Sequence, residues 1–163
     1  PSSVLSETAP PSRGAVPAPS AARSGTAWSE SLSDILEAEG GQLTDVLAHL
    51  RSACGLARPS RGERTAVDLV SRCVEDAEGT MSLVDLIRGS IEGPAAAGMP
   101  GDLRNRWEDT LVSARATVRE MLTPVWDAVG RDLTSGHPAP ADFRALSHLR
   151  DRIGLVLSAA RRP

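Results

Sequence analysis

The sequence predicts an all-α protein, an antiparallel four-helix bundle preceded by a disordered N-terminal arm. Apolar residues recur at helical spacings of three, four and seven over four long stretches of the chain. Aromatic residues make up only 2% of the sequence, so the core must be built from Leu, Val, Ile and Ala. Such aliphatic cores suit the packing of helix on helix better than a sheet, and helices joined by short loops most simply form an antiparallel bundle.

The arm is predicted at residues 1–27 of the 163-residue chain, where Pro, Ser, Ala and Gly dominate and apolar periodicity is absent. Such a segment cannot bury enough apolar surface to offset the entropy lost on ordering. We therefore expect a flexible arm or linker at 1–27 and a bundle domain at 28–163. The first residue is Pro, so the chain is either processed or part of a longer protein.

The first helix is predicted from Ser29, a favourable N-cap residue, to about residue 55. The glycine pair Gly40–Gly41 has a low helix propensity. The apolar periodicity before the pair nevertheless continues in phase after it. We expect one helix that is kinked or frayed at the glycines, with two shorter helices as the alternative. A loop at 55–62, stopped by Pro59, follows.

The second helix is predicted over about 63–92 and is followed by a Gly- and Pro-rich loop at 93–101. Asp102 is the expected cap of the third helix, whose pattern ends near Leu133. Pro124 falls inside this pattern, so it either kinks the helix or marks a new helix capped by Thr123.

The last helix is predicted over about 141–160, after a loop at 134–140. Phe143, Leu146 and Ile153 lie at helical spacing and should share its buried face. Arg161 closes the helix, where a positive charge suits the helix dipole.

The two cysteines, Cys54 and Cys73, are expected to be free thiols. A hairpin centred near residues 58–59 would place them about ten residues, or roughly 15 Å, apart along the helix axes. A disulfide needs Cα atoms within about 7 Å of each other. The sequence therefore predicts no disulfide and a reducing, cytoplasmic location.

The charge pattern argues against nucleic acid as a partner. The net charge is −3, and neither a basic stripe nor aromatic stacking platforms are visible. No run of 18 apolar residues is present, so we expect no transmembrane segment. All 18 basic residues are Arg. A GC-rich genome is the favoured explanation, and selection against lysine in a secreted bacterial effector that acts inside a host cell is the alternative.

The predicted third helix carries a second apolar stripe, on a different side from its main apolar face. Its residues are Leu122, Trp126, Val129 and Leu133. A helix that is apolar on two sides must bury both. Either the last helix covers the stripe, with Trp126 near Phe143, or the stripe is a partner-binding patch with Trp126 as its anchor.

Residues with catalytic or metal-binding chemistry are sparse. The histidines and cysteines lack the spacings of a zinc or di-iron site, so no metal and no cofactor is expected. Arg104 stands in a Gly-x-Leu-Arg setting similar to that in which bacterial GTPase-activating bundles carry an arginine finger, although the ordinary interpretation is an exposed Arg. His148 points away from the core stripe of its helix.

Three functions follow from these observations. The favoured one is a non-enzymatic module that binds another protein, or forms a homodimer, through the apolar face at Leu122, Trp126, Val129 and Leu133. The alternative is a ligand-binding or small enzymatic bundle with a site near Pro124 that uses Trp126, His148 and nearby arginines. A GTPase regulator that acts through Arg104 is the weaker third.

Overall fold

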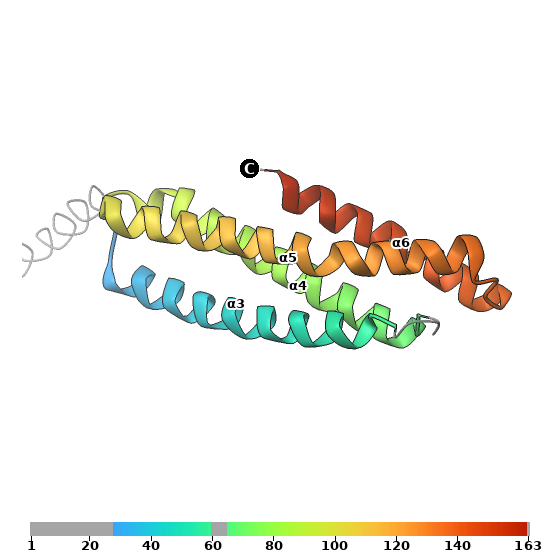
Figure 1. Ribbon diagram of the computed structural model, residues 1–163. Helices are drawn as coiled ribbons and strands as arrows, with labels where there is room; N and C mark the ends of the chain where they lie inside the picture. The colour runs from blue at the N-terminus through green and yellow to red at the C-terminus, as the bar shows by residue number, and fades with distance from the viewer. Residues whose placement is uncertain (1–27, 60–64, 163) are drawn as a thin grey trace, which may run out of the picture.

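A computed structural model describes residues 28–59 and 65–162 (Figure 1). The described residues form four long α-helices and one 3-10 turn, and they contain no strand, so the predicted all-α bundle is confirmed. The predicted arm at 1–27 lies outside the described residues. The elements are α3 (Glu30–Ala57), α4 (Val67–Glu92), η1 (Pro94–Ala96), α5 (Gly101–Ser135) and α6 (Pro140–Arg161).

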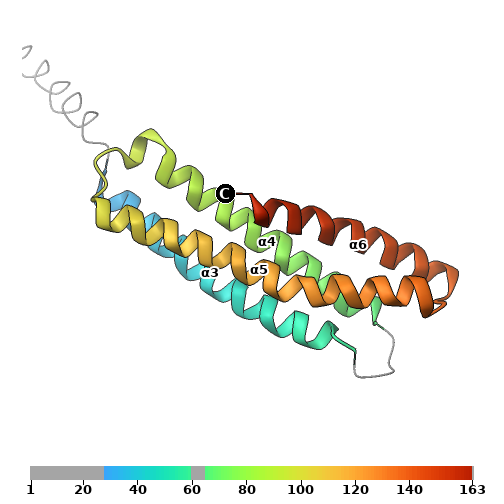
Figure 2. The ribbon, with the colours of Figure 1, turned by 45° about the horizontal axis from the view of Figure 1, so that its top comes forward.

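The four helices form an elongated bundle with two central and two outer members (Figure 2). Helices α4 and α5 each pack against all three other helices, whereas α3 and α6 pack against α4 and α5. Helix α6 has 22 residues and α5 has 35, so α6 covers only part of its neighbour. Both views therefore show the C-terminus partway along the bundle rather than at its end.

Helix α3 runs unbroken through its glycine pair, so the alternative of two shorter helices is wrong. The predicted N-cap is confirmed, because the Ser29 hydroxyl accepts a hydrogen bond from the Leu32 amide. Gly40 has a packing role that periodicity does not reveal. A Cβ atom there would lie 2.7 Å from Cη2 of Trp107 on α5, so the missing side chain lets the indole ring lie against α3.

Helix α5 also runs unbroken, with Pro124 in its interior, so the alternative of a new helix at Thr123 is wrong. Pro124 lacks the amide hydrogen that would complete the helical ladder, and the helix continues past it to Ser135. The predicted cap at Asp102 is also wrong. The N-cap is Pro100, and Asp102 lies within the first turn, where a carboxylate still suits the helix dipole.

The prediction of free thiols is wrong, because Cys54 and Cys73 form a disulfide with their Cα atoms 5.4 Å apart. The prediction assumed a hairpin centred near residues 58–59, with a loop at 55–62. In the structure α3 ends at Ala57 and α4 begins only at Val67, so both the connection and the hairpin centre lie further along the chain. This shift brings the two cysteines level, and both are buried in the core.

The core is aliphatic as the composition predicts, with Leu, Val, Ile, Ala and Met supplying nearly all of its buried side chains. The assignment of Phe143 to the buried face was wrong. Phe143 is 44% exposed, although it falls on the helical periodicity of its helix. It lies in the first turn of α6, which begins at Pro140. None of the described helices combines the length and apolar composition that crossing a bilayer requires.

Candidate functional site

The second apolar stripe of α5 is divided between core and surface. Leu122 and Val129 are both 0% exposed, and Leu133 is partly buried against the core. These residues lie on α5, which packs against α3, α4 and α6. Of the four stripe residues, Trp126 reaches the surface. It is half-buried where α5 and α6 meet.

Trp126 belongs to a reciprocal contact between α5 and α6. Its indole ring lies against Gly154 of α6, where a Cβ atom would be 3.1 Å from Cζ3 of the ring. One turn away, the guanidinium of Arg150 on α6 lies against Gly130 of α5, where a Cβ atom would be 2.8 Å from Nη2. Each helix thus offers a glycine to the large side chain of the other.

The same two large side chains also contact each other. The Arg150 guanidinium carbon lies 4.0 Å from the centroid of the Trp126 ring, which is the geometry of a cation–π interaction. The Nε atom of Arg150 is buried without a hydrogen-bond partner among the described residues. Trp126 therefore packs against Gly154 and Arg150, and not near Phe143 as one sequence interpretation had it.

A surface groove of about 610 Å³ runs beside Trp126, between α5 and α6. Thr123 and Trp126 of α5 form one wall, and α6 supplies the other. The α6 residues are Asp151, Gly154, Leu155, Leu157, Ser158 and Arg161. Leu155 is 73% exposed, the highest value among the exposed large hydrophobic side chains of the described residues.

The two charged residues of the groove sit at opposite ends of its α6 wall. Asp151 and Arg161 are ten residues apart on one helix, which corresponds to about 15 Å. Leu155 lies between them. The groove therefore offers an apolar centre with one acidic and one basic end.

Arg104 is engaged within the chain. Its guanidinium donates hydrogen bonds to the carbonyl of Ile91 at 2.5 Å and to that of Ala96 at 3.1 Å. These carbonyls lie at the C-terminal end of α4 and in the 3-10 turn that follows, where helical partners run out. Arg104 thus ties the first turn of α5 to the end of α4, and this geometry lends no support to an arginine finger.

His148 is exposed on α6 and does not line the groove beside Trp126. The predicted site that combines Trp126 with His148 is therefore not assembled in the described residues. Among residues 28–59 and 65–162, no three His, Cys, Asp or Glu side chains lie close enough together to hold a metal ion.

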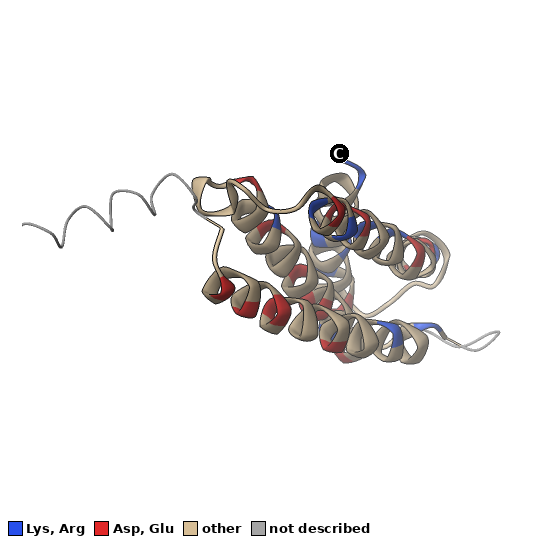
Figure 3. Cartoon of the chain, turned by 90° about the vertical axis from the view of Figure 1, so that its left-hand side faces the viewer, with Lys and Arg blue, Asp and Glu red and all other residues tan. Residues whose placement is uncertain are grey.

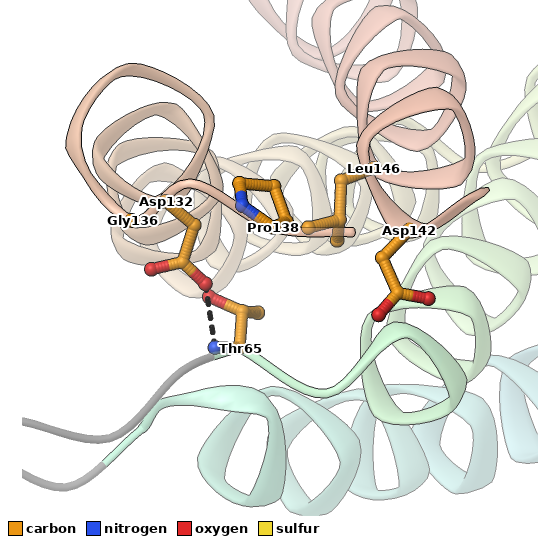
Figure 4. A pocket seen from close by; sticks show the side chains of 6 residues that line it. All are labelled: Thr65, Asp132, Gly136, Pro138, Asp142 and Leu146. Atoms are coloured by element: carbon orange, nitrogen blue, oxygen red, sulfur yellow. Dashed lines mark hydrogen bonds between the residues drawn. The ribbon is translucent and has the colours of Figure 1, made fainter. Parts of the chain in front are cut away.

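A much smaller cavity of about 70 Å³ lies where α4 begins and α6 follows α5 (Figure 4). The Asp132 carboxylate accepts a hydrogen bond of 2.6 Å from the Thr65 amide there, and this bond ties the start of α4 to the end of α5. The buried Thr65 hydroxyl has no partner within the described residues, and Asp142 faces the same space. The volume suits about two water molecules, and we regard the cavity as structural.

Comparison of the chain with protein-family models, with curated proteins and with solved structures finds no match. The geometry of the groove is thus the basis on which a function can be argued. Sequence reasoning found Trp126 but missed Leu155 and Gly154. The available signal was the run Ile153–Leu157, which carries more apolar residues than one buried face of a helix accommodates.

Proposed function

We propose that the chain is a non-enzymatic interaction module that binds another protein through the groove between α5 and α6. The observation that carries the proposal is Leu155, a largely exposed leucine beside the half-buried ring of Trp126. Exposed apolar side chains grouped around a groove are typical of protein-binding surfaces, and Trp is favoured at their centres. The stripe residues Leu122, Val129 and Leu133 act behind this surface by holding Trp126 in place.

The partner element that fits best is an amphipathic helix. A helix laid along the groove would place an apolar side chain over Leu155 and Trp126, and charged side chains opposite Asp151 and Arg161. The charges would fix the direction of the bound helix, because a reversed helix would bring like charges together. No catalytic group of the described residues lines the groove beside its single aspartate and arginine.

The location we propose is an oxidising compartment. Disulfides persist outside the reducing cytosol, and the buried Cys54–Cys73 bond removes the argument for a cytoplasmic location. This fits the secreted alternative raised by the composition. The absence of lysine is equally compatible with codon bias, so it adds no weight.

The test compares Leu155→Glu with Leu56→Glu by affinity capture from the native source. Both leucines are exposed on helices, at 73% and 62%, so neither change should unfold the chain. A partner held by the wild type and by Leu56→Glu, but lost by Leu155→Glu, supports the groove as the binding surface. A partner held equally by both variants contradicts it.

The partner can also be a second copy of the chain. Sedimentation of the purified protein distinguishes this case, because a homodimer formed through the groove should dissociate on the Leu155→Glu change. The alternative function, a small-molecule site near Pro124, retains one supporting observation, since Thr123 and Trp126 wall the groove. Small ligands that bind there and shift the Trp126 fluorescence would favour it.

A further inference from the structure

A second hollow of about 330 Å³ lies on another part of the surface, where α6 ends against α4 and α5. It shares no lining residue with the groove beside Trp126. Figure 3 shows basic residues gathered close to the C-terminus, whereas acidic residues recur along α3. The lining residues are Met81, Asp85 and Arg88 of α4, Arg115 of α5, Ala159 of α6 and Arg162 directly after it.

Arg115 is the unusual member of this pocket. It is 7% exposed, and no residue of the described chain accepts a hydrogen bond from its guanidinium. Burial lowers the pKa of Arg115, the positive charges of Arg88 and Arg119 lower it further, and Asp85 partly opposes them. A buried guanidinium among like charges is unfavourable unless anions compensate it, and Asp85 is the one carboxylate that lines this pocket.

The two arginines beside Arg115 have contacts of their own within the chain. Arg119 donates a hydrogen bond of 2.6 Å to the carbonyl of Ala160, which ties α5 to the last turn of α6 beside the pocket. Arg88 lies 3.9 Å from the carboxylate of Glu92, which is 67% exposed. Arg88 and Arg115 also line a neighbouring hollow that contains Glu92 and Glu108, and neither glutamate lines this pocket.

Charge and shape together indicate the ligand chemistry. Three arginines and one aspartate line the pocket, which gives the lining a formal charge of +2. A phosphate monoester carries close to two negative charges at neutral pH and three acceptor oxygens. Guanidinium groups are well suited to bind such oxyanions through charge-assisted hydrogen bonds.

The pocket is larger than a phosphate group requires, and two of its lining residues are apolar. Met81 and Ala159 lie beside the arginines and offer a surface to an uncharged substituent. We propose that this pocket binds a phosphate group carried on a small organic molecule, held by Arg115, Arg88 and Arg162. The site is independent of the protein-binding function proposed for the groove.

The test titrates the isotopically labelled protein with phenyl phosphate and follows backbone amide shifts at constant ionic strength. Inorganic phosphate and benzoate serve as parallel probes, because they separate the phosphate group from the organic part. The proposal expects saturable shifts around residues 81–88, 115 and 159–162. Phenyl phosphate should bind more tightly than inorganic phosphate, and benzoate should bind most weakly.

Two variants probe the arginines, and a third is a matched control. Arg115→Met and Arg162→Gln should each weaken phenyl phosphate binding by about tenfold or more, since each loses a hydrogen bond to a charged group. Arg162 is exposed, so its variant should fold even if Arg115→Met does not. Arg144→Gln removes an exposed arginine near the other end of α6 and should change the affinity less than about twofold.

Several outcomes would overturn the proposal. Benzoate binding as tight as phenyl phosphate binding would exclude phosphate recognition. Inorganic phosphate binding more tightly than phenyl phosphate would exclude the organic substituent. A loss in Arg144→Gln equal to that in Arg162→Gln would show general charge attraction, and an absence of saturable shifts would exclude the site altogether.

Discussion

The two helical hairpins of the bundle are fastened by different means. In the hairpin of α3 and α4, a long connection separates the helices and the Cys54–Cys73 disulfide fixes their register. In the hairpin of α5 and α6, only residues 136–139 connect the helices, and two glycines receive Trp126 and Arg150. One register is thus set by a covalent bond and the other by the shape of side chains, so the two should respond to different perturbations.

The largest effect is expected from removal of the covalent bond by the double change Cys54→Ala and Cys73→Ala. The disulfide spans 19 residues, and loss of a loop of that length should lower the free energy of unfolding by about 3 kcal/mol. Urea denaturation followed by circular dichroism measures the loss. Wild-type protein reduced in denaturant should reproduce it, and a loss below about 1 kcal/mol would contradict the role given to the bond.

A smaller effect is expected in the second hairpin from Gly154→Val. The added side chain meets the Trp126 ring and should lower the free energy of unfolding by about 2 kcal/mol. Gly89→Val is the control, because nothing lies within 4 Å of a Cβ atom at that exposed position of α4. Equal stability of the two variants would show that the α5–α6 contact tolerates the added side chain.

The contact between the hairpins provides a matched pair of neighbouring glycines. Gly40→Ala should lower the free energy of unfolding by about 1 kcal/mol, because the new methyl group pushes against Trp107. At Gly41 a Cβ atom would have no neighbour within 4 Å, so Gly41→Ala should raise the free energy of unfolding by up to about 1 kcal/mol through its higher helix propensity. Thermal unfolding measures both changes, and changes of the same sign would refute the proposed close approach.

The smallest effect is expected from Glu39→Gln. Glu39 lies on α3 directly before Gly40, which contacts Trp107. Burial raises the pKa of Glu39, and its Oε2 atom has no hydrogen-bond partner among the described residues. Above the raised pKa the carboxylate is ionised in the folded protein, and its burial opposes folding. Glu39→Gln should therefore be more stable than the wild type at pH 7.

The pH dependence distinguishes this cause from a simple packing change. As the pH falls through the raised pKa, Glu39 takes up a proton in the folded protein and the penalty disappears. The advantage of Glu39→Gln should shrink accordingly in urea denaturation series between pH 7 and pH 4. Glu37→Gln, at an exposed position on the same helix, should show little difference at either pH.

The sequence predicted the helices well because helical phase is a local property. The apolar spacing continues across Gly40–Gly41 and across Pro124, and in both places the structure has one unbroken helix. Helix termini were less well predicted. The start of α4 was placed four residues too early, and this error moved the hairpin centre and hid the disulfide.

The candidate sites depend on contacts between helices, which periodicity does not supply. The pattern showed that α5 is apolar on two sides, but it could not tell whether the second side is covered by this chain or by a partner. Leu122 and Val129 are buried within this chain, whereas part of Trp126 remains at the surface. The arginines of the second pocket come from three helices, so no local signal could have joined them.

The disulfide has a consequence for limited proteolysis. Arg61 lies in the stretch of sequence that the Cys54–Cys73 bond closes into a ring, and it is followed by Gly62, whereas Arg58 precedes a proline that blocks tryptic cleavage. A single cut by trypsin after Arg61 would open this ring without separating the two fragments. The nicked protein should migrate as one band in a non-reducing gel and as two bands after reduction.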